Sequence, residues 1–262
     1  MKIKHYLYNT FLIENDKTKI AIDPGQNLWL FKLGSLIPKP EWEDITHIVI
    51  THADPDHYWQ ADRVAKSSKA FVVCGKEMTR VENGKTLVIN PRGKGLTSWI
   101  EIENLHTMIV GEKVALDDVT IEAVKSVHGP IVVPFFGLKK KQYPGPGERV
   151  GLGSMGYKIT INNKTVLNLG DSLLQKEWQG LEPDVLMLPI GGAGENIWTM
   201  DVRDALKAVE SISPKHVIPC HYNASFLWIK NINPVDDLLF KREVEALGIA
   251  CSIMKYGDEI EV

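Results

Sequence analysis

Residues 51–57, Thr-His-Ala-Asp-Pro-Asp-His, carry a dense group of potential metal ligands. His52, Asp54, Asp56 and His57 all fall within six positions of one another. A group of charges this dense needs a compensating charge wherever it is partly buried, and a bound cation is the usual one. The alternative is a polar loop in which Asp54 or Asp56 caps a helix. We favour the cation because further ligand-type residues occur at fitting places.

Three more candidate ligands each follow or end a strand-like run. His128 follows Val124–Val127, Asp171 follows 166–170, and His221 follows 217–220. Strand ends are where α/β folds place their chemistry. Histidine nitrogen and carboxylate oxygen suit zinc, iron or manganese. With one carboxylate shared, the seven residues suffice for two divalent ions.

The elements that would hold these residues can be read from apolar runs and turn signals. We expect strands within 2–14, 19–22, 45–50, 70–74, 86–89, 99–102, 107–110, 119–124, 155–161, 164–169, 184–189, 215–219 and 250–262. Helices are expected over 59–67, 201–212 and 234–247. Asn162-Asn163 is a hairpin signal. Residues 26–40 and 130–151 are expected to be long connections, the second on the surface.

Composition limits the class of protein. The 262 residues fit one large α/β domain or two small ones, and the 44% hydrophobic content is that of a globular protein. The formal net charge of −3 and the lack of a long basic arm give no case for nucleic acid as a partner. Three cysteines without a C-x-x-C pair favour a reducing compartment. No apolar run reaches the roughly 18 residues of a membrane span, and the start lacks a signal core. We therefore expect a cytoplasmic protein with no membrane span.

The chain resembles the metallo-β-lactamase superfamily of metal-dependent hydrolases, whose first motif is His-x-His-x-Asp-His. The resemblance runs from the N-terminal strands to His221. Within the superfamily it is similar to the branch that holds ascorbate-6-phosphate lactonase and N-acyl-phosphatidylethanolamine phospholipase D. The fragments that carry this likeness are Ala21-Ile22-Asp23-Pro24, Asn168-Leu169-Gly170-Asp171-Ser172, Leu188-Pro189-Ile190-Gly191-Gly192, Trp198-Thr199-Met200 and Ile218-Pro219-Cys220-His221-Tyr222.

The resemblance implies an α/β (α+β) fold, a four-layer αββα sandwich of two mixed β-sheets with outer helices, forming one domain over 1–262. It implies that two metal ions are bound. One ion would be held by His52, the residue at 54 and His128, the other by Asp56, His57 and His221, with Asp171 between them. Asp56 would also act in catalysis, by orienting a hydroxide and passing a proton to the leaving group. Asp23 would hold a ligand histidine in one tautomer.

Two departures from the family pattern stand out. Asp54 replaces the usual histidine, and a harder oxygen ligand moves the preference of the first site from zinc towards manganese or iron. Tyr8-Asn9-Thr10 replaces a Gly-His-Ser that is frequent in this branch. The second change bears on a contact to substrate or behind the ligands, and not on the ligands themselves.

The implied activity is hydrolysis by a metal-bound hydroxide of a small-molecule substrate, with a carboxylic ester, lactone or amide ranked first. The alternatives are a phosphodiesterase or phospholipase, an iron-dependent redox enzyme, and a non-catalytic scaffold. Selectivity would lie in the loops at 26–40, 130–150 and 191–199. The sequence names neither the substrate nor the oligomeric state, and a homo-oligomer stays open.

Several other polar residues have competing interpretations. Lys139-Lys140-Lys141 with Arg149 could hold a phosphate, although a solvated loop is the preferred interpretation. Tyr222 and Asn223 are candidates for substrate contact. Cys220 is expected to be a small buried residue, and Gly191-Gly192-Ala193-Gly194 a substrate-side loop. The remaining histidines, expected to be structural or on the surface, are His5, His47, His106 and His216.

Overall fold

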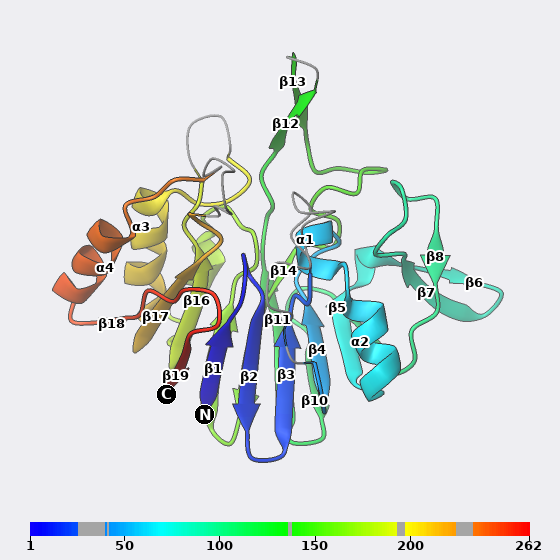
Figure 1. Cartoon of the computed structure of the whole chain (residues 1–262), viewed down its shortest axis with the longest axis horizontal. Coiled ribbons are helices and arrows are strands. Elements are labelled where there is room, and N and C mark those ends of the chain that lie inside the picture. The colour runs from blue at the N-terminus through cyan, green and yellow to red at the C-terminus, as the bar shows by residue number, and fades with distance from the viewer. Residues whose placement is uncertain (26–39, 41, 136–137, 193–196, 224–232) are drawn as a thin grey trace.

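The computed structural model describes residues 1–25, 40, 42–135, 138–192, 197–223 and 233–262. Most of the connection at 26–40 therefore lies outside the described residues, as do Ala193 and Gly194 of the loop at 191–199. Within the described residues, two large β-sheets form the centre of the molecule (Figure 1).

The first sheet contains, in the described part of the chain, seven strands. Their spatial order is β19 (Glu259–Glu261), β1 (Lys2–His5), β2 (Phe11–Asn15), β3 (Thr18–Ile22), β4 (His47–Ile50), β5 (Phe71–Gly75) and β9 (Leu105–Met108). The pairs from β19 to β3 are antiparallel, and those from β3 to β9 are parallel. Parallel strands end at the same edge, so β3 and β4 deliver the residues that follow them to one place.

The second sheet repeats this mixed arrangement, again with seven strands among the described residues. Their order is β10 (Lys113–Leu116), β11 (Val119–Lys125), β14 (Met155–Ile161), β15 (Lys164–Asn168), β16 (Val185–Pro189), β17 (His216–Cys220) and β18 (Ala250–Cys251). Pairing is antiparallel from β10 to β15 and parallel from β15 to β18. The expected hairpin between β14 and β15 is present. Asn162 and Asn163 both have positive φ, 46° and 63°, as a two-residue hairpin turn requires.

The two sheets pack face to face, and their inner faces form one apolar cluster. Ile20 and Val49 of the first sheet and Ile159 and Met187 of the second are fully buried in it. Ala21, which lies between two inward residues of β3, belongs instead to the outer cluster of the first sheet. Each fully buried isoleucine contributes about 1.5–3 kcal/mol relative to an exposed one. This shared core fixes the two sheets relative to each other.

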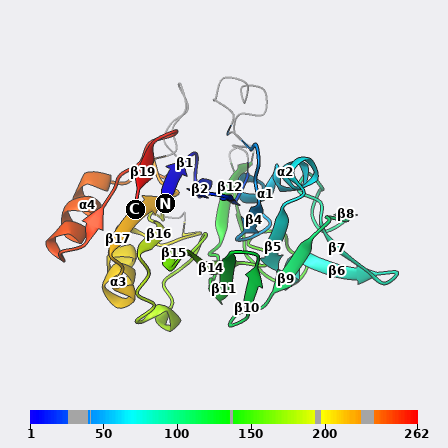
Figure 2. The same ribbon diagram turned by 90° about the horizontal axis from the view of Figure 1, so that it is seen from below.

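Helices cover both outer faces, which completes the predicted αββα sandwich (Figure 2). Beside the first sheet lie α1 (Pro55–Tyr58) and α2 (Ala61–Ser68), and beside the second lie α3 (Val202–Ile212) and α4 (Asp237–Ala246). The described residues also include the short 3₁₀ helices η3 (Lys76–Met78) and η4 (Lys176–Trp178). In α3 the Asp201 side chain accepts the Asp204 N–H as N-cap, and Ala205 and Val209 face the core.

The structure differs from the expected elements in several places. The expected helix over 59–67 begins at Ala61, after the separate short helix α1. Strands β6 (Thr79–Glu82) and β10 were missed; β6 pairs with β7 (Lys85–Ile89) in a small sheet with β8 (Trp99–Ile100). The signal of β6 is weak because its charged residues are exposed and Val81 is 75% exposed.

The expected surface loop at 130–151 is wrong over its first part. Strands β12 (Ile131–Phe135) and β13 (Leu138–Gln142) form a two-stranded ribbon there. It projects from the end of the sandwich where α1 lies (Figure 1). Pro134 argued against a strand, but a ribbon of two strands consists only of edges, where proline is tolerated. The C-terminal residues behave as expected and add β18 and β19 to the edges of the two sheets.

Candidate metal centre

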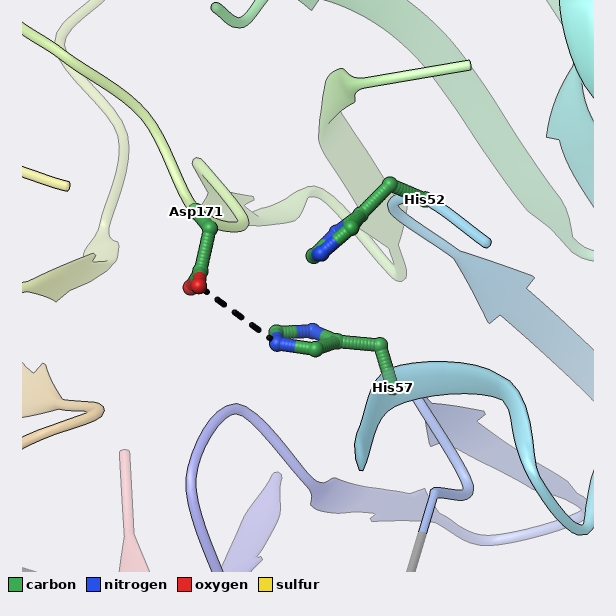
Figure 3. Close-up of side chains that lie close together, drawn as sticks. All are labelled: His52, His57 and Asp171. Atoms are coloured by element: carbon green, nitrogen blue, oxygen red, sulfur yellow. Dashed lines mark ion pairs between the residues drawn. The ribbon is translucent and has the colours of Figure 1, made fainter. Parts of the chain in front are cut away.

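The seven candidate ligands converge on one end of the sandwich, although they come from both sheets. His52 follows β4, and Asp56 and His57 lie in α1. His128, Asp171 and His221 follow β11, β15 and β17 of the second sheet. In Figure 3 the Asp171 carboxylate points at the ring of His57, with the ring of His52 beside them. The site thus lies where the ends of the two sheets meet.

The first group consists of His52, Asp54 and His128. Oδ2 of Asp54 lies 3.4 Å from Nε2 of His52 and 3.4 Å from Nε2 of His128. Asp54 occupies the N-cap position of α1, but its side chain makes no capping hydrogen bond. Instead it accepts the N–H of Gly151 at 3.2 Å. The helix-capping alternative for Asp54 is therefore wrong.

The second group consists of Asp56, His57 and His221. Oδ2 of Asp56 lies 3.6 Å from Nε2 of His57 and 3.4 Å from Nε2 of His221. Asp171 lies between the two groups. Its Oδ2 is 3.2 Å from Nε2 of His221, 3.6 Å from that of His57 and 3.8 Å from that of His128.

These distances between side-chain atoms match the distances between neighbouring donor atoms around one bound metal ion. Hydrogen bonds from nitrogen to oxygen cluster near 2.9–3.0 Å, which is shorter than the distances in either group. Donor atoms around a tetrahedral ion with bonds of about 2.0–2.1 Å lie roughly 3.3–3.4 Å apart. In the described part of the chain, the Nε2 atoms of His52, His57 and His221 and Oδ1 of Asp171 are buried without a hydrogen-bond partner. Buried polar atoms are normally paired, so these atoms fit ligands of bound cations.

Hydrogen bonds behind the rings orient three of the four histidines. Asp23 is fully buried, and its Oδ2 accepts from Nδ1 of His57 at 2.7 Å. Thr51 Oγ1 donates its single proton to Asp23 Oδ2 at 2.6 Å, so at 3.0 Å it accepts from Nδ1 of His52. Nδ1 of His128 donates to the Gly129 carbonyl. Each of these bonds holds the proton on Nδ1 and leaves Nε2 available for an ion.

Charges within the cluster perturb its own acidities. Burial alone would raise the pKa of the Asp56 carboxyl, but His57 and His221 lower it to about 2. The pKa of Asp171 is likewise far below its usual value, because His221 and His57 outweigh its burial. Burial lowers the pKa of His57, yet Asp171, Asp56 and Asp23 together raise it well above the usual value. For His128 burial prevails and the pKa is lowered. Without an ion, carboxylates and protonated imidazoles therefore neutralise one another.

Tight backbone turns present the ligands. Gly170, just before Asp171, has φ +58°, and a Cβ there would lie 2.7 Å from the Thr51 side chain. His221 itself has φ +56°, a left-handed conformation that is rare for a residue other than glycine. Strained residues of this kind cluster at functional sites.

Comparison with known proteins identifies the family of the chain. A family model described as a beta-lactamase superfamily domain matches residues 2–221. The chain belongs to the beta-lactamase superfamily. It is 30% identical over 266 residues to a UPF0173 metal-dependent hydrolase of Nanoarchaeum equitans, with both chains fully covered. It is 31% identical over 228 residues to another UPF0173 metal-dependent hydrolase, from Alkaliphilus metalliredigens, covering 85% of this chain and 86% of the relative.

Solved structures agree with the fold. Igni18, a novel metallo hydrolase from Ignicoccus hospitalis, superposes with a TM-score of 0.68 at 24% identity, covering 99% of this chain and 97% of that one. The chain is thus a metal-dependent hydrolase with the metallo-β-lactamase fold, and its His/Asp clusters are able to bind metal. Among the described residues, none of its helices has both the length and the apolar character to cross a bilayer.

The hydrolase uses Arg149 for structure. Its guanidinium donates to the carbonyls of Ala53, Asn90, Pro91 and Gly93 at 2.6–3.2 Å. Arg149 therefore joins the loop at 90–93 to the loop that carries the first ligands. This correction removes it from the candidate phosphate holders.

Residues beside the ligands have other partners in the hydrolase. Cys220 is fully buried, as expected, and donates to Asn9. Asn223 binds the backbone of Val235, and Tyr222 packs against the outer core of the second sheet. His47 and His216 hydrogen-bond to residues away from the ligands. The ring nitrogens of His5 lie within hydrogen-bond distance of the carbonyls of Met254 and Tyr8, and the Tyr8 carbonyl also accepts the N–H of His221.

Sequence reasoning missed Thr51 as part of the centre, and it left open whether Tyr8-Asn9-Thr10 contacts substrate or lies behind the ligands. Asn9 donates to Asp23 Oδ2 at 2.6 Å, and Thr10 Oγ1 donates to the Asp23 carbonyl at 2.7 Å. The departure at Tyr8-Asn9-Thr10 therefore lies behind the ligands. Its position directly before a core strand was the available signal.

Proposed function

We propose that this hydrolase cleaves a carboxylic ester, lactone or amide of a small molecule, using two divalent cations. The observation that carries the proposal is the position of Asp171 Oδ2 between two His/Asp groups, 3.2–3.8 Å from Nε2 of three histidines. His52, Asp54 and His128 would hold one ion, Asp56, His57 and His221 the other, and Asp171 would contact both. Because these residues span positions 52 to 221, the chain would act as one unit.

When bound, a pair of divalent cations lowers the pKa of water and polarises the oxygen of the attacked group. The protein must then position the reacting groups and move a proton. The Asp56 side chain is 25% exposed, against 12% for Asp54 and 4% for Asp171. Asp56 is therefore the carboxylate best placed to orient the attacking water and to pass its proton to the leaving group.

The charge balance favours an uncharged carbonyl over a phosphate. The carboxylates of Asp23, Asp54, Asp56 and Asp171 together equal the charge of two divalent ions, so little positive charge is left to attract an anion. Arg149, which the sequence left as a possible phosphate holder, donates to backbone carbonyls instead. A phosphodiester stays the second candidate, since the same pair of cations can act on it.

Asp54 supports a specific alternative for the ions. Three carboxylates in the set of seven make it rich in hard oxygen donors, which manganese and iron accept more readily than zinc does. An iron-dependent redox activity is the corresponding alternative function. A non-catalytic scaffold would need no complete ligand set, and here all seven candidate side chains converge.

The test is elemental analysis followed by a substrate panel. The protein is purified without added metal, analysed, and then assayed with manganese or zinc on aryl esters, lactones, amides and a phosphodiester. We expect turnover of a carbonyl substrate, absent from an Asp171→Ala protein prepared in parallel. Turnover of the phosphodiester alone would select the second candidate. Iron with a visible absorption band would indicate redox chemistry, and no turnover of any substrate would favour the scaffold.

A further inference from the structure

Two buried amide side chains meet directly behind the metal centre. Asn9, between β1 and β2, donates from Nδ2 to Oδ1 of Asn168 at 3.0 Å. Asn168, the last residue of β15, donates in return to Oδ1 of Asn9 at 2.9 Å. Asn9 is 1% exposed and Asn168 is fully buried. The reciprocal pair therefore joins the first sheet to the second inside the core.

Each amide also makes a hydrogen bond to a group that supports a candidate ligand. Asn9 Nδ2 donates to Asp23 Oδ2, the atom that accepts from His57. Asn168 Oδ1 accepts the N–H of Gly170 at 2.9 Å, next to Asp171.

A third segment reaches the pair through Cys220. Its thiol donates to Asn9 Oδ1 at 3.3 Å, and the next residue is His221. The pair thus contacts the supports of His57, Asp171 and His221, which surround the second ion position. The first group is linked to the pair indirectly, through Thr51 and through Asp171.

The arrangement needs an amide at both positions. Asn9 spends two donors and two acceptor lone pairs, which is the whole capacity of its side chain. An aspartate at position 9 would lose both donations and put a second carboxylate against Asp23. An aspartate at 168 would keep the acceptor to Gly170 but turn an oxygen towards Asn9 Oδ1. A buried network that is fully satisfied is rigid, and a partly satisfied one is not.

We propose that Asn9 and Asn168 are a positioning pair for the second ion position, formed by Asp56, His57 and His221 with Asp171. The pair sets the direction of the Asp23 carboxylate and the Gly170–Asp171 turn from opposite sides of the sheet interface. This inference rests on the metal-binding part of the proposed function. It assigns a role to the Asn9–Asn168 contact, although neither residue is itself a candidate metal ligand.

The test measures the affinity of each ion separately. Wild type, Asn9→Asp and Asn168→Asp are titrated with zinc, and separately with manganese, in competition with a chromophoric chelator. Changes behind ligands typically cost about 10–100-fold in metal affinity. We expect a loss of that size for the second ion position and a clearly smaller loss for the first, which the pair reaches only through intermediate side chains. Asn104→Asp, the same substitution at an exposed asparagine, is the control.

General destabilisation of the fold would lower the affinity for both ions equally. An equal loss of affinity would therefore overturn the proposal, and so would unchanged binding of both ions. Thermal unfolding of each variant is recorded, and if Asn9→Asp does not fold, Asn168→Asp decides. A metal-free readout separates this inference from the proposed function. In spectra of ¹⁵N-labelled histidine, the Nδ1–H signal of His57 should move in Asn9→Asp while that of His128 stays. A fixed His57 signal overturns the pair's role, whereas a wild type that binds no ions contradicts the proposed function alone.

Discussion

Nδ1 of His57 lies 2.7 Å from Oδ2 of Asp23, and both side chains are fully buried. Asp23 follows β3, and His57 lies in α1, which follows the adjacent strand β4, so the segments after two neighbouring strands meet in this contact. The bond fixes the proton on Nδ1 and directs Nε2 towards Asp56 and Asp171. The same carboxylate holds His52 through Thr51. One buried acid therefore orients a histidine in each group.

Replacing Asp23 should weaken the binding of both metal ions. In the wild type the donors around Asp23 share two carboxylate oxygens. In Asp23→Asn only one oxygen is left to accept these hydrogen bonds, and the amide N–H₂ must face a donor. We expect metal affinity to fall about 10–100-fold, measured by chelator competition. Asp44→Asn is the control, because Asp44 also has positive φ but is exposed. Wild-type affinity in Asp23→Asn would contradict the role of Asp23.

Removing a ligand should abolish hydrolysis. Asp171→Ala deletes the carboxylate between the two groups, and His57→Ala deletes a ligand of the second. We expect turnover to fall by at least about 1,000-fold together with the metal content, measured by elemental analysis of the assayed sample. His106→Ala, on β9, is the control. If either ligand variant keeps wild-type turnover, the assignment of the centre is wrong.

Asp54 should determine which ion the first group prefers. Asp54→His replaces a hard oxygen by imidazole, and the zinc content should rise relative to manganese. The variant and wild type are loaded from equal concentrations of both metals and analysed after desalting. Asp54→Asn, which removes the charge but keeps the oxygen, separates hardness from charge. An unchanged zinc-to-manganese ratio in Asp54→His would contradict the claim that the hard oxygen ligand of Asp54 sets the metal preference.

The metal-free protein should lose stability as pH rises from neutral. The folded-state pKa of His57 is raised well above 6.5, and that of His221 is also raised, chiefly by Asp171 against the effect of burial. The stability that these two protonated histidines contribute is fully present below pH 6.5, and it is lost as the pH rises through their folded-state pKa values. His128 has a lowered pKa and is already neutral there.

We therefore expect the Tm of chelator-treated protein to fall as the pH rises above about 7. The metal-loaded protein is the control, since its ions replace the protons and its Tm should change less. A Tm of the metal-free protein that rises over this range would contradict the electrostatic account.

Arg149→Lys should lower stability without changing the ligands. The guanidinium makes four donations to carbonyls of two loops, and the ammonium of lysine cannot reproduce that planar fork. We expect a loss of about 1–3 kcal/mol in the free energy of unfolding, measured with urea. Arg203→Lys, at a side chain 79% exposed, should be neutral. A loss no larger than in that control would mean the four bonds are not used.

The sequence was sufficient to predict the sandwich and the convergence of the seven candidate ligands. Apolar runs such as 45–50 identified the buried strands, and each ligand-type residue stood just after such a run. The ribbon β12–β13 was missed because prolines and lysines suppress the strand signal there. The capping interpretation of Asp54 failed because local sequence does not reveal Gly151, a donor almost a hundred positions away.

Contacts over long sequence distances account for the other misses. The pairing of Asn9 with Asn168 depends on the packing of one sheet against the other, which no local pattern records. Arg149 could be recognised as a cation near the site, but its carbonyl partners come from loops at 53 and 90–93. The types of side chain predicted metal chemistry, but the hydrogen-bond partner of each side chain depends on the fold.

The split of the ligands between the two sheets has a consequence during synthesis. Four of the seven candidates leave the ribosome within the first 57 residues, but the last emerges only at position 221. A partly made chain offers incomplete sets and releases an ion readily, since a preformed site rarely exists before folding. Firm capture must wait until both halves have docked, so in a growing cell the retained metal would mark molecules that have finished folding.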